Sequence, residues 1–418
     1  MLLLSYQNVA QYLIDSGVFS EAELSDIHLT SGKNNAKNFS IIAALNNGHH
    51  FLIKQERPLF SGNFCYEILN EWQFQRLIEN VPKLSSLKPY LREMLYYDSN
   101  NLIAVYEYLD NYQELYTGIL EPRQVFPTAI PTWLGAMLAQ IHRTTFNCEE
   151  AFAFVTQDGS FWHRKGAAFR LLQDRITPEM LSIAPPDYIR FISLYQRYES
   201  LEQAKLEAIA TWHPCCVVHN DLNVANILVH QDWEGVQATI EACDRSLIKI
   251  IDWERCSWGD PVFDVAHLIA NYIILWLSSM VIDPAMSMEE SINSATITLE
   301  DVRPSIIAFT QEYLQHFPEI TNYFPEFFKK LIQFIGLSLI IQTQAKIEYH
   351  KLLANSDIYA LQVAKSLLCR PQSSFSSIFG MSEQDFCSLS LISFWTHSKN
   401  YRREGWNCNR YVRDNHHF

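Results

Sequence analysis

Apolar and polar positions in the first quarter of the chain alternate in short blocks that predict strands around one helix. Phe39–Leu45 and Phe51–Ile53 are apolar runs, and Asn46–Gly48 between them is a strong hairpin turn. Tyr66–Ile78 carries apolar residues at roughly helical spacing, and Leu102–Val105 is apolar and strand-like. We therefore predict a β-hairpin, then a helix, then a further strand.

The pattern changes to the helical period further along the chain. Apolar residues recur every three or four positions from Ile130 to Ile141, which predicts an amphipathic helix. The serine-rich stretch Gln372–Ser377 is predicted to be a loop, and Met381–Phe418 receives no assignment. Further helices are expected over the segments Val262–Ile282, Arg303–His316, Tyr323–Ala345 and Ser356–Leu368.

One loop in the middle of the chain concentrates polar side chains between two apolar runs. The segment Val217–Val229 has the sequence VVHNDLNVANILV and contains His219, Asp221 and Asn226. Asn226 is too close to Asp221 to lie on a separate element, so both are expected to face a common centre from one tight loop. We expect His219 to stabilise this loop by hydrogen bonding.

A second motif follows in Ile248–Ala266, IKIIDWERCSWGDPVFDVA, where Asp252 emerges at the end of a predicted strand. Metal-assisted phosphoryl transfer requires a carboxylate at the attacking hydroxyl, and an Asn and a second carboxylate that hold magnesium. Mg²⁺ prefers oxygen ligands and keeps several waters, so one protein carboxylate and one amide suffice if a nucleotide supplies the rest. A chance H-x-D-x-x-x-x-N match would explain the loop alone, but the two motifs together predict phosphoryl transfer.

At these residues the chain resembles the aminoglycoside phosphotransferase and choline kinase family, small-molecule relatives of the protein kinases. HNDLNVAN is similar to the catalytic loop of that family, and IIDWERCSWGDPVFDVA is similar to its metal-binding segment. The resemblance implies Asp221 as the catalytic base, Asn226 and Asp252 as Mg²⁺ ligands, and Asp264 as a brace for the catalytic loop. It also implies an α+β, bilobal protein-kinase-like fold with a small β-rich N-lobe and a larger, mostly helical C-lobe.

A kinase-like fold requires a lysine, a glutamate and an adenine-binding hinge in the N-terminal part. Lys54 follows the second apolar run and would pair with nucleotide phosphates. Glu71 on the predicted helix would hold Lys54; Glu67 lies one turn away, but the position of Glu71 resembles the family pattern more closely. Adenine would be bound by backbone groups around Glu107 and Leu109, after the next strand.

The turn that would cradle the phosphates departs from the family pattern. Thr30–Ala36 contains one glycine where a glycine-rich loop has two or more, which limits how closely backbone amides can approach phosphate. Ser31, Asn34 and Asn35 would substitute with side-chain hydrogen bonds. An ordinary surface loop explains this segment nearly as well.

Length and composition favour one bilobal unit. The chain has 418 residues, of which 48% are hydrophobic, enough to bury a large core. We divide it into a nucleotide-binding N-lobe (1–110), a helical C-lobe with the catalytic loop and acceptor site (111–375) and an unassigned C-terminal segment (376–418). The nine cysteines show no metal-ligand spacing, so we expect reduced thiols.

Net charge and hydropathy limit the kinds of binding partner that we expect. A formal net charge of −14 disfavours nucleic acid and fits a cationic acceptor. The apolar run Val262–Ile282 contains Asp264, His267 and Asn271, which a bilayer would penalise, so we expect a buried helix and no membrane partner. Met1–Leu4 is too short for a signal-peptide core, and cytoplasmic residence is the expectation.

The sequence thus predicts a phosphotransferase that uses ATP and Mg²⁺ to phosphorylate a hydroxyl of a small molecule. One alternative is a degenerate nucleotide-binding pseudokinase that kept the cleft without catalysis. Another is a protein kinase, although the chain lacks Asp-Phe-Gly and Ala-Pro-Glu segments. An aminoglycoside, choline or ethanolamine, homoserine, a sugar and a specialised metabolite all remain open as acceptors, and the oligomeric state is not predicted.

Overall fold

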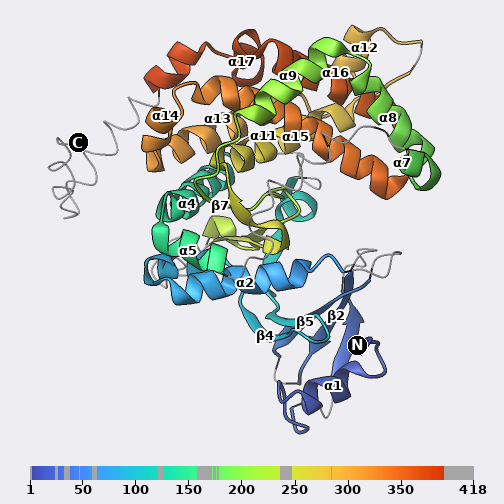
Figure 1. Cartoon of the computed structure of the whole chain (residues 1–418), viewed down its shortest axis with the longest axis vertical. Coiled ribbons are helices and arrows are strands. Elements are labelled where there is room, and N and C mark those ends of the chain that lie inside the picture. The colour runs from blue at the N-terminus through green and yellow to red at the C-terminus, as the bar shows by residue number, and fades with distance from the viewer. Residues whose placement is uncertain are drawn as a thin grey trace, which may run out of the picture.

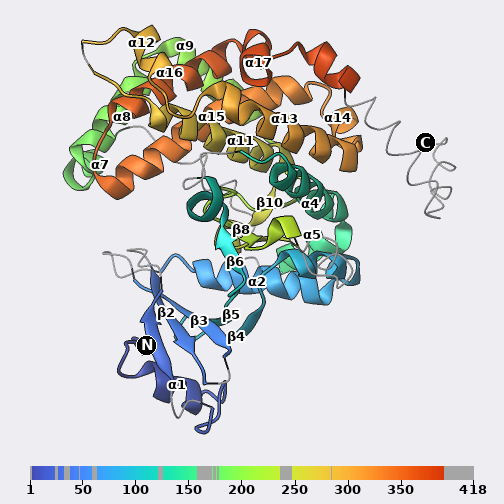
Figure 2. The ribbon, with the colours of Figure 1, turned by 180° about the vertical axis from the view of Figure 1, so that it is seen from behind.

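The structure is a computed structural model with a small β-rich lobe and a large helical lobe (Figures 1 and 2). It describes residues 2–23, 27–32, 38–46, 48–58, 64–120, 126–157, 172, 176, 178–235, 247–283 and 285–389. The bilobal α+β architecture expected from the sequence, with a small β-rich lobe and a larger helical lobe, is confirmed.

The small lobe is built on one antiparallel sheet with the strand order β1-β2-β3-β5-β4. The predicted hairpin is β2–β3, which pairs Ser40 with Lys54, and Gly48 supplies the positive φ of 82° in its turn. Lys54 lies inside β3 because that strand continues beyond the predicted run. The strands are β1 (His28–Ser31), β2 (Asn38–Ala44), β3 (His50–Glu56), β4 (Met94–Asp98) and β5 (Ile103–Glu107).

Alternation of side chains along these strands gives the sheet two buried faces. Ile41, Ile53 and Val105 pack on one face with helix α1 (Val9–Asp15). Leu52 and Tyr106 point to the other face and pack with helix α2 (Glu67–Asn80).

Helix α2 contacts both lobes (Figure 1). Its first turn packs on the sheet through Ile68, whereas Phe74 belongs to the core of the large lobe and stacks on Trp253 with ring centroids 4.1 Å apart. Buried Glu56, at the end of β3, accepts hydrogen bonds from the backbone N–H groups of Tyr66 (2.6 Å) and Ile68 (3.3 Å). This carboxylate caps the helix and ties it to the sheet.

The large lobe is a layer of helices around one apolar core, with α11 (Pro261–Ser279) and α15 (Phe327–His350) near its centre. The other helices of this lobe are α4 (Ala129–Thr145), α5 (Glu149–Gln157), α7 (Pro178–Ile183), α8 (Pro186–Gln196), α9 (Glu199–Ala210), α12 (Met288–Asn293), α13 (Leu299–His316), α14 (Glu319–Tyr323), α16 (Asn355–Cys369) and α17 (Pro371–Phe379). Shorter helical turns are η1 (Pro82–Tyr90), η2 (Leu115–Leu120) and η4 (Trp253–Arg255).

Two small sheets lie between the helical layer and α2 (Figure 2). One has the order β6-β8-β9 and the other pairs β10 with β7. Their strands are β6 (Tyr112–Glu114), β7 (Cys216–Val218), β8 (Ile227–His230), β9 (Ile248–Ile250) and β10 (Ser257–Gly259). The predicted catalytic loop joins β7 to β8, and Asp252 follows β9.

The prediction of a loop over Gln372–Ser377 is wrong, because these residues lie within α17. Pro371 occupies the first turn of the helix, where its missing N–H costs nothing, and Gly380 ends the helix with a φ of 71°. Phe375 and Phe379, one turn apart, are buried and stack on each other with ring centroids 4.5 Å apart. Burial of these aromatic rings outweighs the low helix propensity of the serines.

The large lobe continues past α17 as far as the structure describes it. Residues 383–389 are helical, and Phe386 is fully buried against Phe328 and Phe379. Residues 390–418 of the unassigned segment lie outside the described part.

Helix α11 is, among the described residues, the one helix long and apolar enough to cross a membrane by length and composition. In the structure 72% of that span is buried inside the protein. It runs against α15 and carries buried Asp264 and His267 toward the catalytic loop. The expectation of a buried core helix over Val262–Ile282 matches this placement.

Candidate active site

The loop between β7 and β8 closes on itself through hydrogen bonds. The Asn226 side-chain amide donates to the backbone carbonyl of Asp221 at 2.9 Å, and the Asn226 N–H donates to the carbonyl of Asn223 at 3.0 Å. Asn220 adopts a left-handed φ of 63°, which turns the chain immediately before Asp221. The side chain of Asp221 is a quarter exposed and faces a pocket, whereas Asn226 is buried.

Asp264, in the first turn of α11, holds this loop through hydrogen bonds to its backbone. Its fully buried carboxylate accepts from the backbone N–H of His219 at 2.6 Å and of Asn220 at 2.8 Å, and it lies 3.3 Å from Nε2 of His142. Burial works to raise the pKa of Asp264, but the His142 contact and these N–H donors outweigh it, so the pKa lies below its usual range. The carboxylate is therefore a fixed anion beneath the loop.

His219 fastens the loop to the segment that carries Asp252. Its Nδ1 accepts from the N–H of Asp221 at 3.2 Å, and its Nε2 donates to the carbonyl of Ile251 at 2.9 Å. In return, the N–H of Ile251 donates to the carbonyl of Asn226 at 3.0 Å. The two predicted metal-ligand segments are thus held side by side.

Asp252 turns out of β9 with a left-handed φ of 60° and meets the small lobe. Its carboxylate pairs with the ammonium of Lys54 and lies 3.4 Å from a guanidinium nitrogen of Arg92. Burial raises the pKa of Asp252, but these two cations overcome it and lower the pKa to about 2. The same contact with Asp252 raises the pKa of Lys54 although burial opposes its charge.

Glu71 does not contact Lys54 directly, contrary to the arrangement expected from the sequence. Its carboxylate accepts from the Tyr106 hydroxyl at 2.8 Å and lies 4.0 Å from Arg92. Arg92, almost fully buried, also stacks over the Tyr106 ring at 4.4 Å. Two cations and two carboxylates thus form one buried cluster of Lys54, Arg92, Glu71 and Asp252, in which each carboxylate has at least one cationic neighbour.

The donor atoms near Asp252 suit a hard cation such as Mg²⁺. The ionised carboxylate of Asp252 and the amide oxygen of Asn226 are both oxygen donors, and the amide nitrogen of Asn226 is already turned toward the loop. Within the described ranges, no cluster of three or more His, Cys, Asp and Glu could hold a metal ion. A site here would therefore use few protein ligands, as Mg²⁺ sites with bound phosphates do.

The predicted hinge follows β5, which lies between β3 and β4 in the sheet. The backbone N–H of Glu107 donates to Glu93 and that of Tyr108 donates to His50, each at 3.1 Å. In the part of the chain that the structure describes, the N–H of Leu109 has no hydrogen-bond partner, so it is available to a ligand. This is the donor that adenine recognition by backbone groups requires.

The predicted phosphate turn is described only in part. Ser31 ends β1 with its side chain exposed, and its hydroxyl donates to the carbonyl of Gly32 at 2.9 Å. A Cβ at Gly32 would collide with the side chain of Ser40, so this glycine permits a close approach of β1 to β2. Asn34 and Asn35 lie outside the described residues.

A pocket of about 820 Å³ opens beside Asp221. Its walls come from the catalytic loop, the segment after Asp252, the beginning of α2, helix α11 and the C-terminal half of α15. Besides Asp221, the pocket is lined by three carboxylates, those of Glu67, Glu254 and Glu348. One positively charged side chain, the guanidinium of Arg255, is part of the same lining. Arg255 lies 3.8 Å from the Asp221 carboxylate.

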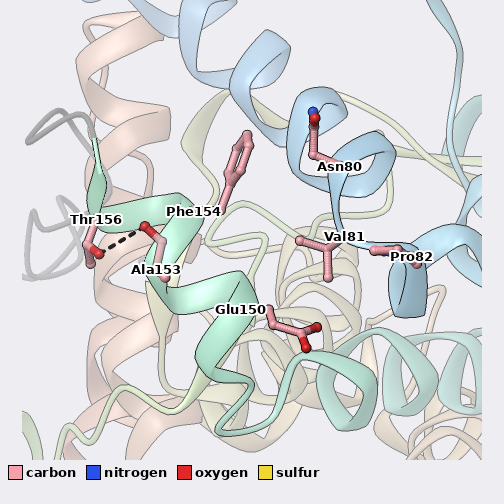
Figure 3. Close-up of a pocket in the computed structure, with 7 residues that line it drawn as sticks. All are labelled: Asn80, Val81, Pro82, Glu150, Ala153, Phe154 and Thr156. Atoms are coloured by element: carbon pink, nitrogen blue, oxygen red, sulfur yellow. Dashed lines mark hydrogen bonds between the residues drawn. The ribbon is translucent and has the colours of Figure 1, made fainter.

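A second, smaller hollow of about 490 Å³ lies between the end of α2 and α5 (Figure 3). Its lining includes Val81, Pro82 and Phe154, and Glu150 there pairs with Lys83 at 3.3 Å. None of the predicted site residues lines it, whereas residues of the catalytic loop line the pocket at Asp221.

Sequence reasoning missed Arg92, Glu56 and the pocket-facing role of His267. Arg92 stands alone before β4 without a motif, and its backbone carbonyl accepts a hydrogen bond from the side chain of Gln75 on α2 at 2.7 Å. Glu56 follows the predicted hairpin and lies ten residues before Tyr66 in the sequence, so no local capping pattern indicates its contact with the start of α2. The sequence pattern shows His267 only as a polar residue in an apolar helix.

Residues 84–284 match the family model described as the phosphotransferase enzyme family (APH). Among solved structures, the chain is similar to LicA in complex with AMP, with 16% identity, 89% of this chain and 100% of that chain covered, and a TM-score of 0.48. A choline/ethanolamine kinase family protein from Mesorhizobium loti is 13% identical, with 90% and 99% covered and a TM-score of 0.43. Macrolide 2'-phosphotransferase MphH from Brachybacterium faecium is 14% identical, with 86% and 99% covered and a TM-score of 0.40.

No curated protein matches the chain. Because the TM-scores given above are all below 0.5, the assignment depends on the match of residues 84–284. That segment contains Arg92, the whole catalytic loop, Asp252 and Asp264. The family resemblance expected from the sequence is therefore confirmed over residues 84–284, which match the phosphotransferase enzyme family.

Proposed function

We propose that this protein is a kinase that uses ATP and Mg²⁺ to phosphorylate a hydroxyl group of a small molecule. The observation that carries the proposal is the convergence of Lys54, Asp252 and the Asp221–Asn226 loop at the junction of the lobes, next to a pocket that faces Asp221. The family match supports the reaction type, and the pocket supports a small acceptor.

Phosphate binding is assigned to the cations of the buried cluster. Lys54 lies on a strand and Arg92 is packed over Tyr106, so both positive charges are held in place by the fold. Fixed cations in a water-poor site stabilise the charge on a transferring phosphoryl group, because they need no reorganisation during the reaction. The backbone N–H of Leu109 would donate a hydrogen bond to the adenine ring.

Metal binding is assigned to Asp252 and Asn226. The low pKa of Asp252 keeps its carboxylate ionised, and the hydrogen bonds of Asn226 orient its amide oxygen as an acceptor. Bound Mg²⁺ supplies charge neutralisation at the phosphates. Lys54 then exchanges its contact with Asp252 for a contact with phosphate oxygen.

Proton transfer is assigned to Asp221. Its carboxylate lies at the pocket wall, while His219 and Asn226 hold its backbone in place. A positioned carboxylate can orient an acceptor hydroxyl and accept its proton as the oxygen–phosphorus bond forms. Asp264 keeps the loop rigid by accepting two of its backbone N–H groups.

The pocket at Asp221 supports a small and basic acceptor. Its volume of about 820 Å³ lies in the range of pockets that bind small molecules. The carboxylates of Glu67, Glu254 and Glu348 give its wall an excess of negative charge over Arg255. Such a wall favours an acceptor that carries a positive charge.

A screen for ATP consumption tests the proposal. The purified protein is incubated with ATP, Mg²⁺ and single compounds from a panel of amino sugars, sugars, amino alcohols and hydroxy amino acids. We expect at least one compound to raise ADP formation above the rate with water alone, and we expect chelation of Mg²⁺ to abolish the increase. Nucleotide binding in a thermal-shift assay without turnover of any compound would instead favour the non-catalytic alternative.

A further inference from the structure

We propose that His267 is a positioning residue for the acceptor, with the reacting hydroxyl seated between its Nε2 and the Asp221 carboxylate. This inference rests on the proposed function, since it concerns the acceptor pocket of the same reaction. It assigns a role to a side chain outside the catalytic loop and outside the metal-binding segment.

The position of His267 on α11 places it at the catalytic loop. It lies one turn after Asp264, is 3% exposed and lines the pocket at Asp221. Its Nε2 is 3.9 Å from Oδ1 of Asp221. That separation is too long for a hydrogen bond, but a single hydroxyl oxygen can lie at hydrogen-bond distance from both atoms.

Both ring nitrogens of His267 lack a hydrogen-bond partner among the described residues. A buried polar group without a partner is costly, so such a group at a pocket wall indicates a site that a ligand or water completes. The surrounding contacts hold the residue itself in place: the side chains of Asn271 and Gln342 both donate to its backbone carbonyl at 3.0 Å. These bonds hold the backbone at His267, the Phe263 ring packs beside the imidazole with ring centroids 5.5 Å apart, and the two ring nitrogens are left for the pocket.

The charge state of His267 suits binding rather than proton transfer. Burial lowers its pKa to about 4, although the carboxylates of Asp221 and Asp264 pull in the opposite direction, while His219 and Arg255 add to the lowering. At neutral pH the ring is uncharged and carries one N–H donor. Asp221 beside it is the group left to accept the proton.

His267 keeps the same protonation state throughout the proposed phosphoryl transfer. The acceptor hydroxyl accepts a hydrogen bond from Nε2–H and donates its own proton to the Asp221 carboxylate. A bond forms between the hydroxyl oxygen and the γ-phosphorus, and the bond from that phosphorus to the β,γ-bridging oxygen breaks. The electron pair of the broken bond leaves with ADP.

Steady-state kinetics of two variants test the role. His267→Phe keeps a flat ring and removes both nitrogens, and His267→Asn keeps a side-chain N–H of shorter reach. For a panel compound that the wild type phosphorylates, we expect His267→Phe to raise the acceptor KM by about tenfold or more, because one hydrogen bond to the bound hydroxyl is lost. His267→Asn should recover part of the loss, and the Kd of MgATP should stay within about twofold in both.

His316→Phe is the matched control, since His316 contacts Glu312 on α13 and does not line the pocket. An acceptor KM within about twofold of wild type in both His267 variants, while the wild type turns over, would overturn the inference and leave the proposed function intact. If the wild type phosphorylates no compound of the panel, that result contradicts the proposed function, independently of the role of His267. A binding measurement then decides the inference.

That measurement is ¹⁵N NMR of histidine-labelled protein bound to a non-hydrolysable ATP analogue and Mg²⁺, titrated with glycerol as the probe hydroxyl. The His267 signals are identified by their loss in His267→Phe, or in His267→Asn if the first variant does not fold. We expect a ring-nitrogen shift of His267 that saturates with glycerol, while the His316 signals stay in place. Unmoved His267 signals would overturn the inference.

Discussion

Lys54 of β3 and Asp252 beyond β9 form an ion pair that joins the cation of the small lobe to the carboxylate of the large lobe. Both side chains are largely buried, and Arg92 adds a second cation to the same carboxylate. In the proposed reaction this pair is exchanged for phosphate and metal contacts. The fold therefore presents the two groups in one place before any ligand enters.

Replacement of Lys54 by Met should weaken nucleotide binding. The variant loses a charge-assisted contact to the phosphates, so we expect the Kd of MgATP to rise by about tenfold or more. Isothermal titration calorimetry measures this directly. Lys83→Met is the control, because Lys83 is 66% exposed and pairs with Glu150 at the surface. Equal Kd values for both variants and the wild type would contradict the assignment of Lys54.

Asp252→Asn should remove the metal dependence of nucleotide binding. The variant keeps the shape of the side chain and loses the charge that the lowered pKa maintains in the wild type. We expect the wild type to bind ATP more tightly with Mg²⁺ than with a chelator, and the variant to bind it equally in both conditions. The exposed Asp232 offers a control in Asp232→Asn. A preserved effect of Mg²⁺ in Asp252→Asn would count against the metal site.

Asp264→Ala should destabilise the folded protein as well as abolish turnover. The substitution leaves the buried N–H groups of His219 and Asn220 without an acceptor, at a cost of about 1–3 kcal/mol for each in the free energy of unfolding. Urea unfolding of the variant, beside Glu300→Ala at an exposed position, measures the difference. Unfolding midpoints that coincide for the two variants would show that Asp264 does not support the loop.

Stability should fall in mild acid because of His267. Its pKa lies near 4 in the folded state and near 6.5 when unfolded, so the unfolded chain binds more protons between these values. The contribution of His267 to the free energy of unfolding is fully present above pH 6.5. It is lost as the pH falls toward 4, by about 3 kcal/mol in total. The groups that face His267 and set this shift are Asp221, Asp264, His219 and Arg255.

The difference between wild type and His267→Phe isolates this effect from the other histidines. Free energies of unfolding measured across that pH range should decline more steeply for the wild type than for the variant. Parallel curves would show that His267 is not held neutral by its surroundings.

Local patterns were sufficient to predict the elements that carry the motifs. Asp221 and Asn226 lie on one loop because their separation leaves no room for two elements, and Asp252 follows a strand because the apolar run before it is short and β-branched. The helix from Ile130 to Ile141 was predicted by its period alone. These are properties of neighbouring residues, which a sequence contains directly.

Contacts between distant segments could not be predicted in the same way. Glu71 was expected to hold Lys54, but its neighbours in space are Tyr106 and Arg92, and Asp252 contacts the lysine instead. Which carboxylate meets which cation depends on how α2 packs between the lobes. The helix α17 was missed for a related reason, since its stability comes from aromatic burial against α15 and residues 383–389.

The most direct test of the proposed function compares turnover and nucleotide binding in the wild type and in Asp221→Asn. We predict Mg²⁺-dependent phosphorylation of a panel acceptor by the wild type and a rate at least about a hundredfold lower in the variant, because a positioned base is lost. The Kd of MgATP should remain within about twofold in the folded variant. A variant that retains the wild-type rate, or that loses nucleotide binding together with its fold, would contradict the assignment of Asp221 as the base.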